Sequence, residues 1–364
     1  MQDSPDALRD TFRDVIRRAS ASRTPLRLAG GRSKDFYGQT PTGELLDTRG
    51  YAGIVDYDPA ELVITARCGT PLREIEAALA DRRQMLAFEP PHFGAATLGG
   101  AVAAGLSGPR RQAVGALRDF VLGVSMMDGR GDVLHFGGQV MKNVAGYDVS
   151  RLLAGSMGTL GLILDVSLKV LPLPFDDATL RFELAQDEAL RRLNEWGGQP
   201  LPIAASAWHD GVLWVRLSGA AAALRAARER LGGEAVDPDA AATLWHQLRE
   251  QTHAFFAPAH AGAPLWRLAV PTTAAPLPLP GDGALLVEWG GGQRWWLPAQ
   301  PVPAAQVRAV ALAAGGHATL FRNGDKDEGV FTPLAAPLAA IQARLKAAFD
   351  PAGIFNPGRM YPSL

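Results

Sequence analysis

Four short glycine-rich segments are spread along the chain, and their residue types suit the binding of anions. They lie at Ala29–Ser33, Thr97–Gly105, Gly155–Gly161 and Asn356–Gly358. Glycine adopts positive φ at little steric cost and lets successive backbone N–H groups converge on one anion. Taken singly, each segment is also typical of a tight turn or of close packing between two backbones. The surrounding residues therefore have to decide between these interpretations.

The first segment has the clearest phosphate-binding character. A short apolar strand runs into Gly30-Gly31, which is followed by Arg32, Ser33 and Lys34. The Ser33 hydroxyl can donate to a phosphate oxygen, and a flanking cation can balance its charge. An ordinary turn that ends a strand would explain the same residues.

The second and third segments consist mainly of small residues. Gly99 to Gly105 holds almost no side chain larger than a methyl group, so it can lie against a flat ligand or against another backbone. As a helix, it would direct N–H groups near Thr97 at a phosphate, and a tightly packed core helix is the competing interpretation. In Gly155–Gly161, glycines at every third position precede a buried strand. The dinucleotide G-x-G-x-x-G spacing and the P-loop motif are both missing, which disfavours Rossmann and P-loop sites.

Together, in this order and at this spacing, the four segments resemble the FAD-binding domain of the vanillyl-alcohol oxidase/p-cresol methylhydroxylase (PCMH) superfamily. Phe349–Pro351 and Ile354–Arg359 resemble the C-terminal signature of that superfamily. Lys142–Asp148 and Gly155–Gly161 are similar to its glycolate- and D-lactate-oxidising branch. The short chain and the Leu62–Thr70 segment look closest to the FAD-binding subunits of bacterial glycolate oxidases.

The resemblance implies an α+β fold: a two-subdomain PCMH-type FAD-binding domain with an inserted α/β sandwich cap domain. It also implies roles for particular residues. The pyrophosphate would be cradled by Ala29, Gly30, Gly31, Arg32 and Ser33, and the flavin-side groove would be lined by Thr97, Gly99, Gly100 and Gly105. Gly158, Gly161 and Ile163 would approach the adenosine and ribityl portions, and Asn356 would sit near the isoalloxazine edge. No catalytic residue is predicted.

The elements that must position these segments change in character along the chain. Up to about Leu173 the sequence predicts short strands and glycine turns, including a strand at Leu26–Ala29 and a hairpin across Asp128–Gly131. Beyond Pro172-Leu173-Pro174 it predicts longer alternating strands and helices, with an antiparallel sheet backed by helices on one face. We therefore predict an FAD domain at 1–174, a cap at 175–345 and a C-terminal segment at 346–364 that returns to the FAD domain.

Composition narrows the class of protein. The chain has 364 residues, 47% hydrophobic and 20% charged, with a formal net charge of −1, which suits a globular protein and disfavours nucleic-acid binding. Its single cysteine, Cys68, excludes an internal disulfide and an iron–sulfur cluster held by this chain alone. Because neither a signal peptide nor a membrane span is apparent, we expect a cytoplasmic location, with peripheral attachment to the inner membrane through a complex as an alternative.

The histidines depart from the pattern of the resembled family. Members with covalent flavin use a His or Cys near the isoalloxazine, whereas Arg32-Ser33-Lys34 offers neither, so non-covalent FAD is expected, with His92 as the alternative attachment point. Catalytic subunits of the branch carry a histidine-rich metal segment in the cap. The cap histidines here are well separated in sequence, and no metal site is predicted. They are His209, His246, His253, His260 and His317.

Several other residues leave alternatives open. Met157 stands where many catalytic subunits hold an acidic residue. Arg267, Arg322 and Lys326 could bind a carboxylate or form ordinary salt bridges. Trp289, Trp295 and Trp296 flank a glycine turn, and they are as typical of a partner interface as of a core.

Three functions follow from the resemblance. The first is an FAD-binding redox subunit of a glycolate oxidase complex, with a second flavoprotein subunit and an iron–sulfur subunit as partners and a small 2-hydroxy acid as substrate. The second is a non-catalytic module that stabilises its partner, which the missing cap histidines favour. The third is a standalone FAD-dependent oxidase of another alcohol.

Overall fold

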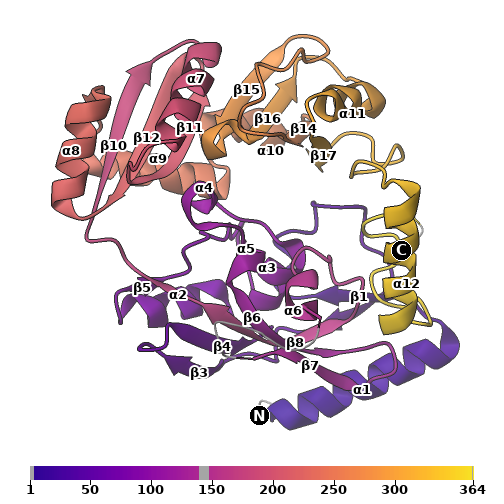
Figure 1. Ribbon diagram of the computed structural model, residues 1–364. Coiled ribbons are helices and arrows are strands. Elements are labelled where there is room, and N and C mark those ends of the chain that lie inside the picture. The colour runs from indigo at the N-terminus through magenta and orange to yellow at the C-terminus, as the bar shows by residue number, and fades with distance from the viewer. Residues whose placement is uncertain (1–3, 139–146, 363) are drawn as a thin grey trace. The chain divides into compact units, whose positions relative to one another are not determined.

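The computed structural model describes residues 4–138, 147–362 and 364 (Figure 1). The chain divides into two compact units. The first unit comprises Met1–Leu106, Ala116–Pro172 and Pro333–Leu364, and the second unit comprises Ser107–Gly115 and Leu173–Thr332. This division falls close to the predicted boundary at 174, but residues 333–345 join the first unit and residues 107–115 join the second. Most of the predicted Lys142–Asp148 motif lies outside the described residues.

The first unit contains a five-stranded antiparallel sheet and two small two-stranded sheets. The five-stranded sheet has the order β3-β4-β8-β6-β7, and the small sheets are β1-β2 and β5-β9. Its strands are β1 (Leu26–Ala29), β2 (Glu44–Asp47), β3 (Ile54–Asp58), β4 (Val63–Arg67), β5 (Gln84–Met85), β6 (Val121–Met127), β7 (Val133–Gly137), β8 (Leu162–Lys169) and β9 (Leu171–Pro172). Its helices are α1 (Pro5–Ser22), α2 (Leu72–Ala80), α3 (Leu98–Ala104), α5 (Leu117–Phe120), α6 (Val149–Leu152) and α12 (Ala336–Phe349).

Local sequence explains several of these elements. The Ser4 hydroxyl caps α1 by accepting from the Ala7 N–H at 3.2 Å, and Pro5 occupies the first turn. Phe12 and Ile16 recur at helical spacing and are buried. The predicted β6–β7 hairpin is confirmed, with Met127 opposite Val133.

The C-terminal segment adds to the edge of β1. Leu26 forms a parallel bridge with Phe355, its N–H donates to the Ile354 carbonyl at 2.7 Å, and its carbonyl accepts from the Asn356 N–H at 2.9 Å. On its other side β1 pairs in parallel with β2. The strand that leads into Gly30-Gly31 is therefore held from both sides.

The second unit is built on one eight-stranded antiparallel sheet, ordered β13-β10-β12-β11-β15-β16-β14-β17. Its strands are β10 (Asp176–Glu183), β11 (Ile203–His209), β12 (Val212–Gly219), β13 (Glu234–Ala235), β14 (Leu265–Ala269), β15 (Gly283–Glu288), β16 (Gln293–Pro298) and β17 (His317–Arg322). Its helices are α4 (Arg111–Val114), α7 (Gln186–Gly197), α8 (Ala221–Leu231), α9 (Pro238–Glu250), α10 (Ala257–His260) and α11 (Ala304–Ala313), with single turns η1 (Ala254–Phe256) and η2 (Trp289–Gly291).

The expectation of helices on one face of this sheet is wrong. Leu180 of β10 packs in one cluster with Leu193 of α7 and Leu224 of α8. The adjacent Thr179 points to the opposite face, where its hydroxyl accepts from the Trp245 indole N–H of α9 at 2.9 Å. Helices therefore cover both faces. Among the helices described, none is long and apolar enough to cross a membrane.

Candidate cofactor-binding site

All the residues predicted for the cofactor site except Gly105 line one cavity of the first unit. These are Ala29, Gly30, Gly31, Arg32, Ser33, Thr97, Gly99, Gly100, Gly158, Gly161, Ile163 and Asn356. Gly105 instead ends α3 at φ +64, where an added Cβ would lie 2.9 Å from the Gly155 Cα. Its glycine is explained by the helix end and by close backbone packing. Two other lining residues, Lys34 and Met157, were noted in the sequence without being assigned to the site. Sequence reasoning missed Arg27, Asp35, Cys68 and Arg359.

The loop after β1 presents a run of backbone donors. Among the described residues, the N–H groups of Gly30, Gly31, Arg32 and Ser33 meet no hydrogen-bond acceptor. Arg32 adopts φ +59 between residues of negative φ, an alternation that directs neighbouring N–H groups to one side of the chain. Unpaired N–H groups that line a cavity favour an anionic ligand there. The loop thus has the donors that a phosphate group requires.

Several of the cavity glycines are required because the backbone there packs closely against neighbouring segments. A Cβ on Gly31 would lie 1.4 Å from the Ala95 carbonyl oxygen, and one on Gly99 would lie 2.6 Å from the Cys68 Cβ. A Cβ on Gly161 would collide with Met126 at 2.2 Å. Gly100 differs, because it is exposed and its Cβ would approach only the Thr97 hydroxyl, at 3.3 Å. The segments therefore combine tight packing with an open backbone surface.

Thr97 supplies an orphaned polar atom beside this surface. Its Oγ1 is buried and has no hydrogen-bond partner within the described chain. A buried hydroxyl without a partner is costly in a folded protein unless a ligand or water satisfies it. This hydroxyl and the unpaired N–H groups of Gly30–Ser33 are therefore suited to bind a phosphate-bearing cofactor such as FAD.

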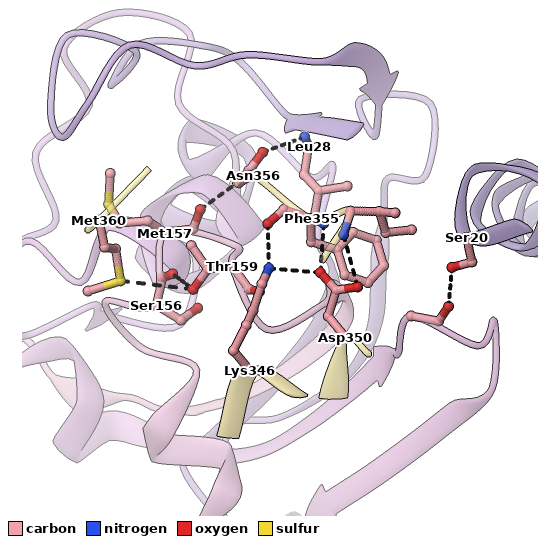
Figure 2. A network of polar contacts seen from close by, with 12 residues as sticks. Ser20, Leu28, Ser156, Met157, Thr159, Lys346, Asp350, Phe355, Asn356 and Met360 are labelled. Atoms are coloured by element: carbon pink, nitrogen blue, oxygen red, sulfur yellow. Dashed lines mark hydrogen bonds and ion pairs between the residues drawn. The ribbon is translucent and has the colours of Figure 1, made fainter. Parts of the chain in front are cut away.

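The Asn356 side chain joins two walls of the cavity, as Figure 2 shows. Its Oδ1 accepts from the Leu28 N–H at 2.9 Å, and its Nδ2 donates to the Met157 carbonyl at 2.7 Å. Leu28 precedes the Gly30–Ser33 loop, and Met157 lies in the Gly155–Gly161 segment. Asn356 therefore connects the first and third glycine segments, an alignment that sequence alone did not reveal.

A buried ion pair anchors the C-terminal segment (Figure 2). Lys346 of α12 is 8% exposed, and its Nζ donates to Asp350 Oδ2 at 2.7 Å, the Thr159 carbonyl at 2.7 Å and the Phe355 carbonyl at 2.8 Å. Asp350 also accepts the N–H groups of Ile354 and Phe355. Burial lowers the pKa of Lys346, and Asp350 opposes that shift. The charge is thus paired and fully hydrogen-bonded, as a buried ion pair requires.

Cys68 and His92, the residues considered for covalent attachment of a flavin, are disfavoured for different reasons. Cys68 lines the cavity, but burial raises the pKa of its thiol to about 12, so the nucleophilic thiolate is disfavoured. His92 is not one of the cavity-lining residues, and its Nε2 lies 3.0 Å from Glu76 Oε2.

The histidines of the second unit contact main-chain and aromatic groups. His209 Nδ1 lies 2.9 Å from the Leu285 carbonyl, His253 Nδ1 accepts from the Phe255 N–H, and the two imidazole rings are 6.0 Å apart. Burial is the larger cause of the lowered pKa of His253, and the electrostatic effect of His209 lowers it further. Within the described ranges, no group of three or more His, Cys, Asp or Glu residues could hold a metal ion.

The remaining candidates of the second unit have structural contacts. Arg322 donates to Gln251 Oε1 at 3.1 Å, and the Arg267 guanidinium lies 5.4 Å from the centre of the Phe321 ring. Trp295 and Trp296 are buried in the core of this unit, so these two side chains are core residues and not part of a partner interface. Trp289 donates to the Gly108 carbonyl at 3.1 Å and stacks under Arg111 at 4.2 Å; both belong to the Ser107–Gly115 segment of the same unit.

Comparison with known proteins shows which class of protein this chain resembles. A family profile described as an FAD binding domain matches residues 9–137. Solved structures of alkyldihydroxyacetonephosphate synthase share the fold, with a TM-score of 0.64 at 14% identity over 96% of this chain and 74% of that one. The chain thus carries an FAD-binding domain with the PCMH-type fold.

Its sequence relatives narrow this class. Glycolate oxidase subunit GlcE of Escherichia coli (strain K12) is 49% identical over 352 residues, which span 96% of this chain and 97% of that protein. Glycolate oxidase subunit GlcD of Bacillus subtilis (strain 168) is 29% identical over 49% of this chain and 40% of its own length. The chain belongs to the family of the glycolate oxidase subunit GlcE.

Proposed function

We propose that this chain is the FAD-binding subunit of a glycolate oxidase complex and takes part in oxidising glycolate, a small 2-hydroxy acid, to glyoxylate. The observation that carries the proposal is the 49% identity to a glycolate oxidase subunit over nearly the full length of both chains. The cavity supports it independently, because its unpaired donors suit a phosphate-bearing cofactor. The identity extends over both units, and the unpaired donors of the cavity belong to the first unit alone.

In this proposal the cavity residues hold FAD without a covalent bond. The backbone N–H groups of Gly30–Ser33 would bind the diphosphate, and the Thr97 hydroxyl and the Gly100 backbone would face the cofactor. Asn356 would keep the two glycine segments in register, since both ends of its amide bond to the backbone. When bound, FAD would supply the two-electron acceptor for the substrate hydride. The protonated thiol of Cys68 favours the non-covalent mode.

A relay or stabilising role is the second candidate. General-base catalysis needs a titratable group with a free site toward the substrate. Among the described residues no group of His, Cys, Asp or Glu could hold the metal that a histidine-rich catalytic cap would carry, which favours a chain that depends on a partner for substrate oxidation. The partners in this proposal are a second flavoprotein subunit and an iron–sulfur subunit, with attachment to the inner membrane through the complex. A standalone alcohol oxidase would require a base within this chain.

Purified chain, alone and co-expressed with its candidate flavoprotein partner, separates these functions. The proposal predicts bound flavin in the chain alone and glycolate-dependent bleaching of flavin absorbance in the complex. Bleaching by glycolate in the chain alone would establish autonomous oxidation, and bleaching only in the complex would establish the dependence on a partner. A complex that glycolate leaves fully oxidised, while another 2-hydroxy acid reduces it, would contradict the choice of glycolate.

A further inference from the structure

Arg359, in the C-terminal segment, is a buried guanidinium with an unsatisfied donor. It is 6% exposed and lines the cavity that holds the Gly30–Ser33 loop. Its Nη2 donates to the Asp35 carbonyl at 3.1 Å and reaches the Lys34 carbonyl at 3.4 Å. Its Nη1 is buried and has no hydrogen-bond partner among the described residues. A guanidinium carries five N–H donors, and buried donors without acceptors are costly.

The charges around the cavity do not balance. Among its described lining residues, Arg27, Arg32, Lys34 and Arg359 are cationic, and Asp35 is the one carboxylate, so four positive charges face one negative charge. That carboxylate is already paired with Arg27 and with Arg32 Nε, the latter at 3.0 Å. The whole chain, by contrast, has a net charge of −1. The cavity is therefore a local concentration of positive charge.

Burial makes this arrangement unfavourable for Arg359 unless an anion joins it. Burial lowers the pKa of its guanidinium to about 10, and Asp35 only partly opposes the shift. A buried cation is normally stabilised by a paired anion. Guanidinium binds phosphate and carboxylate oxygens through paired N–H donors, so an oxyanion is the ligand that this site fits.

We propose that Arg359 binds the diphosphate of FAD, opposite the backbone donors of Gly30–Ser33. The diphosphate is favoured over the carboxylate of the hydroxy acid because Arg359 bonds to the carbonyls of Lys34 and Asp35, which directly follow that loop. The inference deepens the proposed cofactor role and rests on it. It also assigns a binding function to a residue outside the glycine segments.

The test uses two fragments of FAD that separate its chemistry. ADP carries the diphosphate and lacks the flavin, and riboflavin carries the flavin and lacks phosphate. In calorimetric titrations of the apo protein, Arg359→Met should raise the dissociation constants of FAD and ADP by about tenfold or more. The dissociation constant of riboflavin should change by less than about twofold. Arg359→Lys should fall between, since it keeps the charge and loses the paired donors. Arg344→Met, on the exposed face of α12, is the matched control and should match the wild type.

Four results would overturn the inference. Unchanged ADP and FAD affinity in a folded Arg359→Met variant would remove Arg359 from the diphosphate site. An equal loss of affinity for riboflavin and for ADP would indicate general damage to the cavity. If Arg359→Met fails to fold, an Arg359→Lys variant that binds ADP as tightly as the wild type would likewise point to a structural role for Arg359. Retained FAD affinity with lost glycolate binding in the complex would assign Arg359 to the substrate carboxylate. Because ADP binding requires no glycolate oxidation, failure of the proposed reaction would leave this test intact.

Discussion

Two buried arginines, one in each unit, show how differently the two parts of the molecule treat polar groups. Arg294 of the second unit is fully buried and donates to the Gly291 carbonyl at 3.2 Å, the Ala275 carbonyl at 2.7 Å and the Ala274 carbonyl. Arg359 of the first unit leaves Nη1 without a partner in the described chain. Burial lowers the pKa of both to about 10. Each guanidinium nitrogen of Arg294 thus has an acceptor, whereas Nη1 of the similarly buried Arg359 has none among the described residues.

The same contrast extends to other polar groups. In the second unit, buried Glu288 accepts from Trp295 at 2.6 Å and from Gln293 at 3.0 Å. In the first unit, the Thr97 hydroxyl and the loop N–H groups have no partner among the described residues. The second unit also has a buried side-chain donor without a partner among the described residues, Gln186 Nε2. The unpaired atoms of Arg27, Thr97 and Arg359 in the first unit differ in that all three residues line one cavity, which suits a ligand there.

The largest effect is expected from filling the tightest glycine contact of the cavity. Gly31→Val places a Cβ 1.4 Å from the Ala95 carbonyl, which the backbone can relieve only by moving. We expect the free energy of unfolding to fall by more than about 5 kcal/mol, beyond the usual range for overpacking, and we expect the purified variant to retain no FAD. Gly138→Ala is the matched control, because nothing lies within 4 Å of its added Cβ. FAD retention by Gly31→Val, read from the visible spectrum, would contradict the packing account.

Breaking the buried ion pair should come next. Lys346→Met strands Asp350 and two carbonyls, so unfolding of the first unit should be easier by about 3–5 kcal/mol. All eight tryptophans lie in the second unit, so urea unfolding followed by tryptophan fluorescence should stay unshifted while circular dichroism shows an earlier transition. Arg344→Met serves as the exposed control on the same helix. A shift below about 1 kcal/mol would refute an anchoring role for Lys346.

Removing Arg294 should reverse that pattern. Arg294→Met leaves three carbonyls of the second unit without a donor, at a cost of about 2–4 kcal/mol in total after relaxation. Tryptophan fluorescence should report the earlier unfolding, and the FAD dissociation constant should stay within about twofold of the wild type. Weakened FAD binding in this variant would show that the two units are not separable in function.

Thr97→Val tests the orphaned hydroxyl. The change is nearly isosteric and removes an unsatisfied buried donor, so the apo protein should be as stable as the wild type or more stable. FAD affinity should fall by about tenfold if the hydroxyl serves the cofactor. Thr65→Val is the control: it breaks the 2.8 Å contact with Ser167 and should lower stability without changing FAD affinity. Unchanged FAD affinity in Thr97→Val would leave the hydroxyl outside the site.

The smallest effect concerns pH. Burial, followed by His209, lowers the pKa of His253 below its ordinary value of 6.5, so the unfolded chain binds more protons than the folded chain just below pH 6.5. Stability of the second unit should therefore fall as pH drops through this range, by less than about 1 kcal/mol. His253→Asn keeps an acceptor for the Phe255 N–H and should flatten the profile. The exposed His246→Asn is the control, and a profile that His253→Asn leaves unchanged would remove this assignment.

How far the sequence could predict this protein depends on the range of the interactions. Local signals predicted the β6–β7 hairpin, and the local Ser4-Pro5 start explains where α1 begins. For β16 the sequence indicated the glycine turn before it but not the bounds of the strand, because all its residues are buried and show no alternation. The Lys346 contact with Thr159 and the two Asn356 contacts join segments nearly two hundred or more residues apart, and no local signal in the sequence announces them. Gly105 lies at the end of α3 and outside the cavity lining, and a helix-ending glycine and a ligand-facing glycine look alike in sequence.

The central claim, that the first unit holds FAD without a covalent bond, is tested most directly by one spectrum. The purified chain, supplied with FAD and freed of excess cofactor, is examined by visible absorption before and after acid precipitation. The account predicts flavin bands that copurify with the chain and pass entirely into the supernatant. Flavin that stays with the precipitate would show a covalent bond, and a chain without flavin absorbance would contradict the claim itself.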